Sequence, residues 1–234
     1  NDSKANIFCR YFTNIARSLK KQSFPVQNFI WKTPVQISER TYRRFNFKYV
    51  SKIFVEKELK LLKKHKSAGL DNLPPLLLRD SASVISKPIS CIINLSLKSG
   101  KIPTEWKTAK VIPLHKSGKT TMPDNYRPIS ILPVLSKILE NAVQKQLICY
   151  LEECNLLSPD QFGYRKKRST EIATTLFIDN IRKEIDKGCM AGAVFIDLSK
   201  AFDTLGHSSL ISKLKSYGIR KVAIEMLENY FCER

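Results

Sequence analysis

The chain has 234 residues, 43% of them hydrophobic, which is enough for one large or two small globular domains and excludes wholesale disorder. No apolar run approaches the roughly 18 residues that a membrane helix needs. The 40 lysine and arginine residues exceed the 21 acidic ones, giving a net charge of +19. This excess favours a polyanion such as nucleic acid over an anionic membrane, with an ordinary basic protein as the alternative.

The cysteines and the first residue indicate the kind of protein to which the chain belongs. The six cysteines form no CxxC pair, and the three histidines complete no zinc-ligand spacing. The chain begins with Asn1, and no signal-peptide pattern follows it. We therefore expect a reduced, zinc-free, intracellular piece of a longer protein.

Residues 1–66 are strongly basic, with 16 basic and 4 acidic side chains. Within residues 3–22 the apolar side chains recur at helical spacing, which predicts a helix with one packing face. A linker or loop is expected over residues 23–41, which contain two prolines. The predicted packing face consists of Ile7, Phe8, Tyr11, Phe12, Ile15, Ala16 and Leu19.

The next stretch predicts a strand and two helices. Arg44–Val50 alternates aromatic and polar residues, which is typical of a short half-buried strand. Ser51 is placed to cap a helix that buries Val55, Leu59 and Leu62. An apolar-periodic segment from Val84 to Leu97 then predicts a helix closed by Gly100, with a break or kink at Pro88.

Two strands and a helix are predicted after this. Val111, Ile112 and Leu114 form the expected core of the first strand, and Asn125–Leu132 returns as the second. The two strands could pair as a hairpin with a long polar tip. Pro133 opens an amphipathic helix that extends to Leu151.

A loop at residues 157–170 carries four consecutive basic residues, Arg165–Arg168. Such a run is usually solvated, but Phe162 and Tyr164 beside it also suit a strand of nucleic acid, and the residues favour neither reading. Ser169 then caps a predicted helix that ends at Gly188.

The segment Ala191–His207, AGAVFIDLSKAFDTLGH, begins with a short apolar run that predicts a strand buried on both faces. Asp197 ends this strand, at the rim of a sheet where ligand sites often lie. On the pattern alone, Asp197 is either a metal ligand or a cap for the next turn. Two further helical patterns follow, separated by Gly218.

Six ordered blocks of this sequence resemble the reverse transcriptases of non-LTR retrotransposons, in the long interspersed element group, with the jockey-like elements as the nearest match. The blocks are KSAGLDNLP, IPTEWKTAKVIPLHKSG, NYRPISILPVLSKILE, LSPDQFGYRKKRST, FIDLSKAFDTLGH and YGIRKVAIEMLENYF. The resemblance implies an α+β right-hand polymerase with a helical connector over residues 1–66 and a polymerase domain over residues 67–234. In that domain the fingers span about 67–188, and the palm starts at about 189–234.

The resemblance also assigns candidate roles to particular residues. Asp197, with the Leu198 backbone carbonyl, would bind Mg²⁺, which prefers carboxylate and phosphate oxygens. Phe202 would pack under the sugar of the incoming nucleotide. Lys116 and Arg127 would hold its triphosphate, with Lys110 as the substitute for Lys116 because the stretch 117–126 is long. The template and primer would be bound by Gln161, Arg165, Lys166, Lys167 and Arg168.

The sequence departs from the family at its C-terminal side, since it contains no Asp-Asp pair. We therefore expect an incomplete polymerase that lacks the palm catalytic hairpin and the thumb and is inactive and poorly soluble alone. The expected partners are RNA template, DNA primer and deoxynucleoside triphosphates, in the nucleus and in cytoplasmic ribonucleoprotein. The alternatives are a non-catalytic nucleic-acid-binding relic and, less favoured, an intron-encoded maturase.

Overall fold

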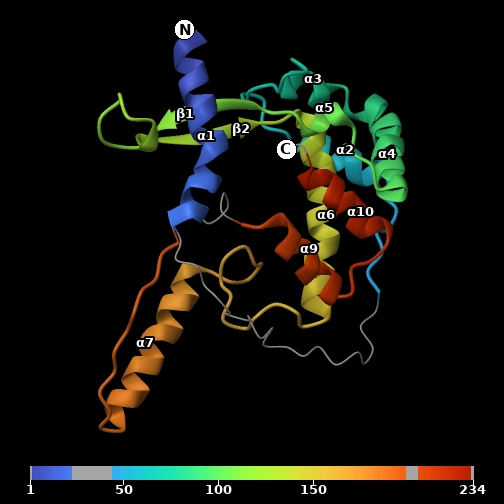
Figure 1. Ribbon diagram of the computed structural model, residues 1–234. Helices are drawn as coiled ribbons and strands as arrows, with labels where there is room; N and C mark the ends of the chain where they lie inside the picture. Colours follow the sequence, from blue (N-terminus) through green and yellow to red (C-terminus); the bar gives the residue numbers. More distant parts are fainter. Residues whose placement is uncertain (1, 23–43, 199–204, 233–234) are drawn as a thin grey trace. The chain divides into compact units, whose positions relative to one another are not determined.

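The computed structural model describes residues 2–22, 44–198 and 205–232, and only the backbone of residues 2 and 15–22 (Figure 1). Phe202 and the predicted linker at 23–41 lie outside the described residues. The chain forms two compact units, one made of residues 1–149 and 202–234 and the other of residues 150–201. The predicted division at residue 66 stays a prediction.

The described part of the chain is a set of helices with one two-stranded sheet, which is an α+β arrangement. No described helix is long and apolar enough to cross a membrane. The helices are α1 (Asp2–Gln22), α2 (Lys52–Lys60), α3 (Pro75–Asp80), α4 (Ala82–Ser99), α5 (Thr104–Lys107), η1 (Pro123–Asn125), α6 (Val134–Glu153), α7 (Thr170–Asp186), α9 (His207–Ser216) and α10 (Val222–Phe231).

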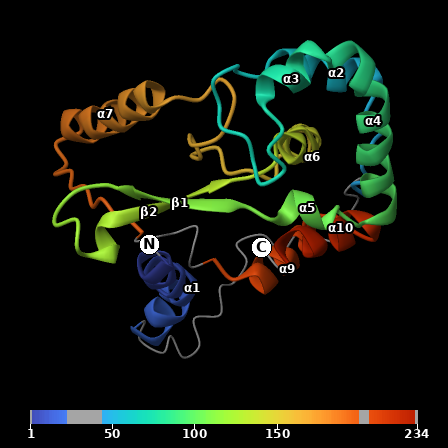
Figure 2. The ribbon, with the colours of Figure 1, turned by 90° about the horizontal axis from the view of Figure 1, so that it is seen from above.

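The core of the larger unit lies between α2, α4, α10 and the first part of α6 (Figure 2). The predicted buried positions Val55 and Leu59 on α2 are confirmed, and both side chains are fully buried, whereas the third, Leu62, lies after the end of α2 and is partly buried. Ser51 caps α2 as predicted, because its hydroxyl accepts a hydrogen bond from the Phe54 amide. The other buried positions in this core include Ile93, Leu97, Ile138, Leu139, Ala142 and Met226.

Helix α4 contains one predicted feature and one that differs from the prediction. Gly100 ends the helix in the left-handed conformation, with φ of 71°, as expected for a glycine cap. Of the predicted break or kink at Pro88, the break is absent, since α4 continues through this residue. Pro88 removes one backbone donor, but its position on the exposed side of the helix leaves the freed carbonyl open to water.

The strand predicted at Arg44–Val50 is reduced to a single bridge. Phe45 pairs with Ile219, and its amide donates to the Gly218 carbonyl over 3.2 Å. The rest of this segment is held by side chains instead. The Gln146 amide group makes two hydrogen bonds to the backbone of Lys48, and the Asn94 amide group makes two 2.8 Å hydrogen bonds to the backbone of Val50. Because Asn94 satisfies both polar groups of Val50, no neighbouring strand is needed there.

The predicted hairpin is confirmed. Strand β1 (Lys110–His115) pairs in antiparallel fashion with β2 (Tyr126–Ile131). Val111, Ile112 and Leu114, the predicted core of the first strand, all lie in β1, and each of their side chains is between 40% and 53% exposed. The physical reason is that this sheet has only two strands, so neither of its faces is covered by a full layer of the described elements.

The strand predicted at the start of Ala191–His207 is also wrong for the described residues. The backbone of residues 191–198 belongs to no strand, and Val194, Phe195 and Ile196 are each more than 80% exposed. A strand requires a second strand to pair with its backbone, and the described residues offer none here. The segment returns beside α7, where the Phe195 ring lies 5.7 Å from that of Phe177 (Figure 1).

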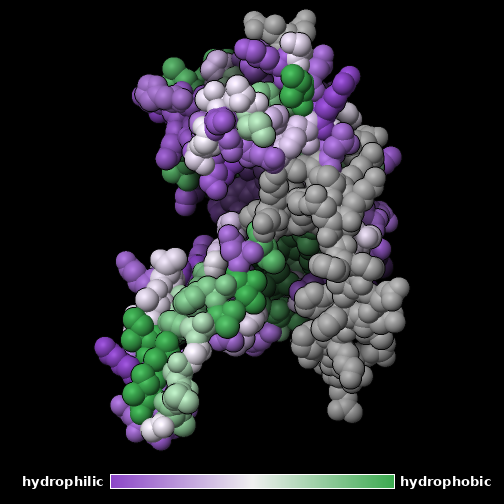
Figure 3. Space-filling view, turned by 60° about the vertical axis from the view of Figure 1, so that its left-hand side comes forward, coloured by the Kyte–Doolittle hydropathy of each residue, from purple (hydrophilic) through white to green (hydrophobic). Residues whose placement is uncertain are grey.

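Helix α7 begins at its predicted cap but buries no side chain. The Ser169 hydroxyl accepts a hydrogen bond from the Ile172 amide, and Gly188 follows the helix with φ of 78°. The apolar residues of α7 and of the segment after it form an exposed patch (Figure 3). This patch consists of Ile172, Leu176, Phe177, Ile178, Ile185, Val194, Phe195 and Ile196.

Candidate nucleotide and nucleic-acid interface

The register of the β1–β2 hairpin places the two predicted triphosphate-binding cations on one face. Leu114 lies directly opposite Arg127, and side chains two residues apart on a strand share a face. Lys116 follows Leu114 by two residues, so it is the diagonal neighbour of Arg127, at about 7–8 Å between backbones. Both side chains are exposed. Two cations at this separation can contact one polyphosphate group simultaneously.

The long tip between these residues does not disturb the register. The Lys116 amide donates to the Asn125 carbonyl over 2.7 Å, which extends the pairing one step beyond the strands. The tip is then closed by the Asn125 side chain, which donates to the Lys119 carbonyl over 2.8 Å, and by the Tyr126 hydroxyl, which donates to the Thr120 carbonyl over 2.9 Å. The inserted residues therefore leave Lys116 beside Arg127.

Lys110, the predicted substitute for Lys116, lies at the other end of the hairpin. It shares the face of Arg127 by the same alternation, but it pairs with Ile131, four residues further along β2. At about 3.4 Å per residue this separates Lys110 from Arg127 by roughly 14 Å along the strand. The geometry thus favours Lys116 as the partner of Arg127.

The basic side chains of the loop between α6 and α7 form two groups, one engaged in contacts within the chain and the other exposed. The Arg165 guanidinium donates to the Ser158 carbonyl over 2.8 Å and lies 3.6 Å from the Glu152 carboxylate, with only 15% of its side chain exposed. Arg168 lies over the Phe162 ring at 5.1 Å. Both arginines therefore fix the shape of the loop.

The other basic residues of this loop point outward. Lys166 and Lys167 are exposed, and Lys167 adopts a left-handed backbone with φ of 58°. Gln161 is also exposed, and its amide donates to the Gly163 carbonyl over 3.2 Å. The loop thus presents two lysines for a polyanion on a frame held by two arginines.

Asp197 and Leu198 lie in the exposed segment after α7, and the Leu198 side chain is 70% exposed. No group of three or more His, Cys, Asp or Glu residues that could hold a metal ion exists within residues 2–22, 44–198 and 205–232. One carboxylate cannot complete the octahedral oxygen shell of Mg²⁺. The described residues therefore do not by themselves fit a magnesium site.

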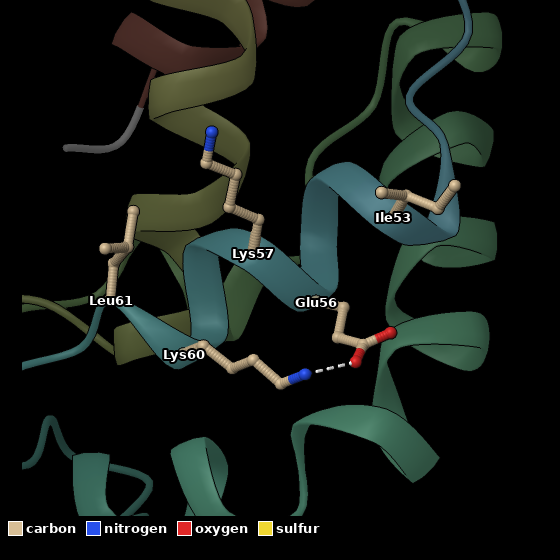
Figure 4. Close-up of a pocket in the computed structure, with 5 residues that line it drawn as sticks. All are labelled: Ile53, Glu56, Lys57, Lys60 and Leu61. Carbon is tan, nitrogen blue, oxygen red and sulfur yellow. Dashed lines mark hydrogen bonds and ion pairs between the residues drawn. The ribbon is translucent and has the colours of Figure 1, made fainter.

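A shallow hollow on the exposed side of α2 contains none of these candidate residues. It is lined by Ile53, Glu56, Lys57, Lys60 and Leu61, as Figure 4 shows. The Lys60 ammonium donates to the Glu56 carboxylate over 2.6 Å, and this hydrogen bond holds the pKa of Glu56 below its usual value. The hollow offers an ion pair and two aliphatic side chains, without a convergent set of polar groups.

The sequence did not reveal the aromatic contacts of the hairpin tip. The rings of His115 and Tyr126 are 5.1 Å apart, and the Phe8 ring of α1 lies 4.7 Å from that of Tyr126. The apolar stripe of residues 3–22 predicted a packing face, but its target lies more than 100 residues away in the chain. Only the fold identifies that target.

Comparison with known proteins identifies a protein family that matches the part of the chain carrying this site. Residues 114–233 match the family described as reverse transcriptase (RNA-dependent DNA polymerase). This range contains Lys116, Arg127, Asp197 and the basic loop, and it excludes Lys110.

Individual relatives are polymerases of mobile elements. The chain is 34% identical over 180 residues to the probable RNA-directed DNA polymerase from transposon BS of Drosophila melanogaster, covering 71% of this chain and 19% of the relative. It is 33% identical over 147 residues to the RNA-directed DNA polymerase from mobile element jockey of the same species, covering 62% and 16%. For the Pol polyprotein from type-1 retrotransposable element R2 of Popillia japonica, the identity is 32% over 127 residues, covering 54% and 17%. The chain spans about a fifth or less of the length of these relatives.

Proposed function

Because the chain belongs to the reverse transcriptase family, among the jockey-like polymerases of non-LTR retrotransposons, we propose that it forms the fingers and the first part of the palm of a right-hand RNA-directed DNA polymerase. Its partners in the intact protein are an RNA template, a DNA primer and deoxynucleoside triphosphates. The intact protein acts in cytoplasmic ribonucleoprotein and in the nucleus.

The observation that carries this proposal is the register of the hairpin. Lys116 and Arg127 are diagonal neighbours on one face, and both are exposed. Their role is to bind the triphosphate of the incoming nucleotide, since a guanidinium and an ammonium together neutralise phosphate oxygens. Fixing the triphosphate orients the nucleotide for attack, which is the positioning component of catalysis.

The outward lysines of the basic loop have a separate role. Lys166 and Lys167 contact phosphates of the template or primer, and Gln161 lies beside them in the same loop. Arg165 and Arg168 support this contact by holding the loop in shape, because their guanidinium groups are engaged within the chain. Binding that depends on phosphate contacts weakens steeply as the salt concentration rises.

Asp197 would supply one carboxylate ligand, with the Leu198 carbonyl beside it, to a divalent metal site that further carboxylates would have to complete. The metal would be Mg²⁺, and it would supply stabilisation of negative charge in phosphoryl transfer. Phe202 packs under the sugar of the nucleotide and disfavours a 2′-hydroxyl. With one candidate carboxylate among the described residues, the 234-residue chain alone is inactive in primer extension.

Nucleotide affinity tests this proposal. We expect Arg127→Ala and Lys116→Ala each to weaken dTTP binding by about tenfold or more, because a hydrogen bond to a charged group is worth about 1.5–3 kcal/mol. Lys110→Ala is the matched control, since it removes the same kind of side chain from the same face at the far end of the hairpin. Equal affinities for the Lys116→Ala and Lys110→Ala variants would contradict the proposed role of the hairpin.

The exposed lysines of the basic loop also support a second candidate, a nucleic-acid-binding relic without catalysis. This candidate predicts salt-dependent RNA binding that survives Asp197→Ala and is lost in a Lys166→Ala, Lys167→Ala double variant. Extension of a primer on a poly-A template by the 234-residue chain would exclude it. Absence of RNA binding at low salt would exclude it as well.

A further inference from the structure

Helix α1 places its aromatic side chains against the tip of the hairpin. Phe8, Tyr11 and Phe12 are half-buried, whereas Ile7 on the same helix is 54% exposed. The Phe8 ring meets the Tyr126 ring edge-on at 4.7 Å, and the Tyr11 hydroxyl donates to the Asp124 carboxylate. Figures 1 and 2 both show α1 beside the hairpin.

This contact lies on the side of the hairpin that does not carry the cations. Tyr126 pairs directly with His115, so their side chains share one face, and their rings are 5.1 Å apart. By the alternation of the strands, Lys116 and Arg127 point to the opposite face. Helix α1 can therefore support the tip while leaving both cations open to a ligand.

The hairpin requires such support for a physical reason. An isolated two-stranded ribbon is marginally stable in water. The base of β2 is anchored because Leu132 and Pro133, which follow it, are buried in the larger unit. The middle of the ribbon is exposed on both faces, as described above. The tip is held by its own hydrogen bonds and by α1.

We propose that α1 braces the hairpin tip, and that Phe8 and Tyr11 are positioning residues that keep Lys116 in register with Arg127 for nucleotide binding. This inference rests on the proposed function of the hairpin. The residues act through Tyr126 and Asp124, which immediately flank the end of the pairing, and they do not touch the nucleotide. A shift at this end of the ribbon changes the spacing of the two cations, because the Lys116–Asn125 bond is the last step of the ladder.

The brace itself is tested by amide hydrogen exchange of the 234-residue chain. We expect Phe8→Ala to accelerate exchange of the Lys116 amide about three- to tenfold, because the variant loses the stabilisation that one edge-on aromatic pair gives to the closed hairpin tip. Ile7→Ala is the matched control on the exposed side of α1 and leaves this rate unchanged. Phe8→Tyr keeps the ring and restores the slow exchange. An unchanged Lys116 rate in Phe8→Ala, with unchanged exchange in α2 and α4, would overturn the proposal.

Nucleotide affinity then separates positioning from simple structural support. We expect Phe8→Ala to weaken dTTP binding about threefold or more and Phe8→Tyr to bind as the wild type does. If Lys116→Ala weakens binding but Phe8→Ala does not, α1 supports the fold without positioning the cations, and the proposal fails. If Lys116→Ala and Arg127→Ala both leave the dTTP affinity unchanged, the proposed function fails. Faster exchange of the Lys116 amide in Phe8→Ala would then show that α1 braces the hairpin tip without a role in nucleotide binding.

Discussion

Two segments of this chain predict strands from similar apolar runs, and only one of them forms a strand. The β1 sequence pairs with β2, which begins eleven residues after β1 ends. The segment Ala191–Leu198 pairs with no described strand and exposes its apolar side chains. The difference shows that an apolar run alone does not make a strand, because a strand also requires a nearby partner for its amides and carbonyls.

The same contrast separates the two compact units. The larger unit contains fully buried side chains on α2 and α4, whereas α7 in the smaller unit buries none. Stability in the larger unit therefore comes from tertiary packing. In the smaller unit it comes from local capping and from a few ring contacts.

The largest expected difference in stability is between alanine variants of two leucines, one from each unit. Leu59→Ala should lower the free energy of unfolding by about 2–5 kcal/mol, because Leu59 is 0% exposed and its removal leaves a cavity. Leu198→Ala should change it by less than about 0.5 kcal/mol, since Leu198 is 70% exposed. Urea unfolding followed by circular dichroism measures both variants. A large loss in Leu198→Ala would mean that the segment is packed in solution.

A second comparison uses the two serine caps. Ser51→Ala should destabilise the chain by about 1 kcal/mol, because α2 belongs to the packed core. Ser169→Ala should instead reduce the helicity of α7 and leave the unfolding midpoint of the larger unit unchanged, because α7 buries no side chain. Residue-specific exchange of α7 amides distinguishes the two results. Equal losses of global stability would contradict the contrast between the units.

A third comparison tests the closed hairpin tip with two glycines. Gly118 has φ of 82°, and an added Cβ would lie 2.7 Å from the Asn125 side chain. Gly118→Ala should therefore cost about 1 kcal/mol or more of local hairpin stability, measured by exchange of the Lys116 amide. At Gly163 an added Cβ meets nothing within 4 Å. Gly163→Ala should leave the same amide unaffected, and similar exchange in both variants would argue against a tightly closed tip.

The smallest expected effect concerns the ion pair on α2. The hydrogen bond from Lys60 lowers the pKa of Glu56, so the pair adds stability above the unfolded-state pKa. That contribution is lost as the pH falls through the lowered folded-state pKa. Glu56→Gln should remove this small pH dependence, and 0.5 M salt should mask it in the wild type because the pair is on the surface. A pH dependence that persists in Glu56→Gln would require another carboxylate.

Local signals in the sequence predicted much of this fold correctly. The caps at Ser51 and Ser169, the glycine end at Gly100 and the hairpin all depend on residues close in the chain. The strand predicted at Ala191–Ile196 was wrong, because strand pairing depends on distant elements about which sequence periodicity carries no information. The diagonal placement of Lys116 and Arg127 could be read only from the register, since the length of the tip argued against it.

The most direct test of the central claim is a double-mutant cycle on dTTP binding. If Lys116 and Arg127 hold one triphosphate from adjacent positions, the pair should show a coupling energy of about 0.5 kcal/mol or more between Lys116→Ala and Arg127→Ala. The parallel cycle with Lys110→Ala and Arg127→Ala should show no coupling, because roughly 14 Å of strand separates those residues. Coupling in the second cycle and none in the first would contradict the assignment of the hairpin as the triphosphate-binding site.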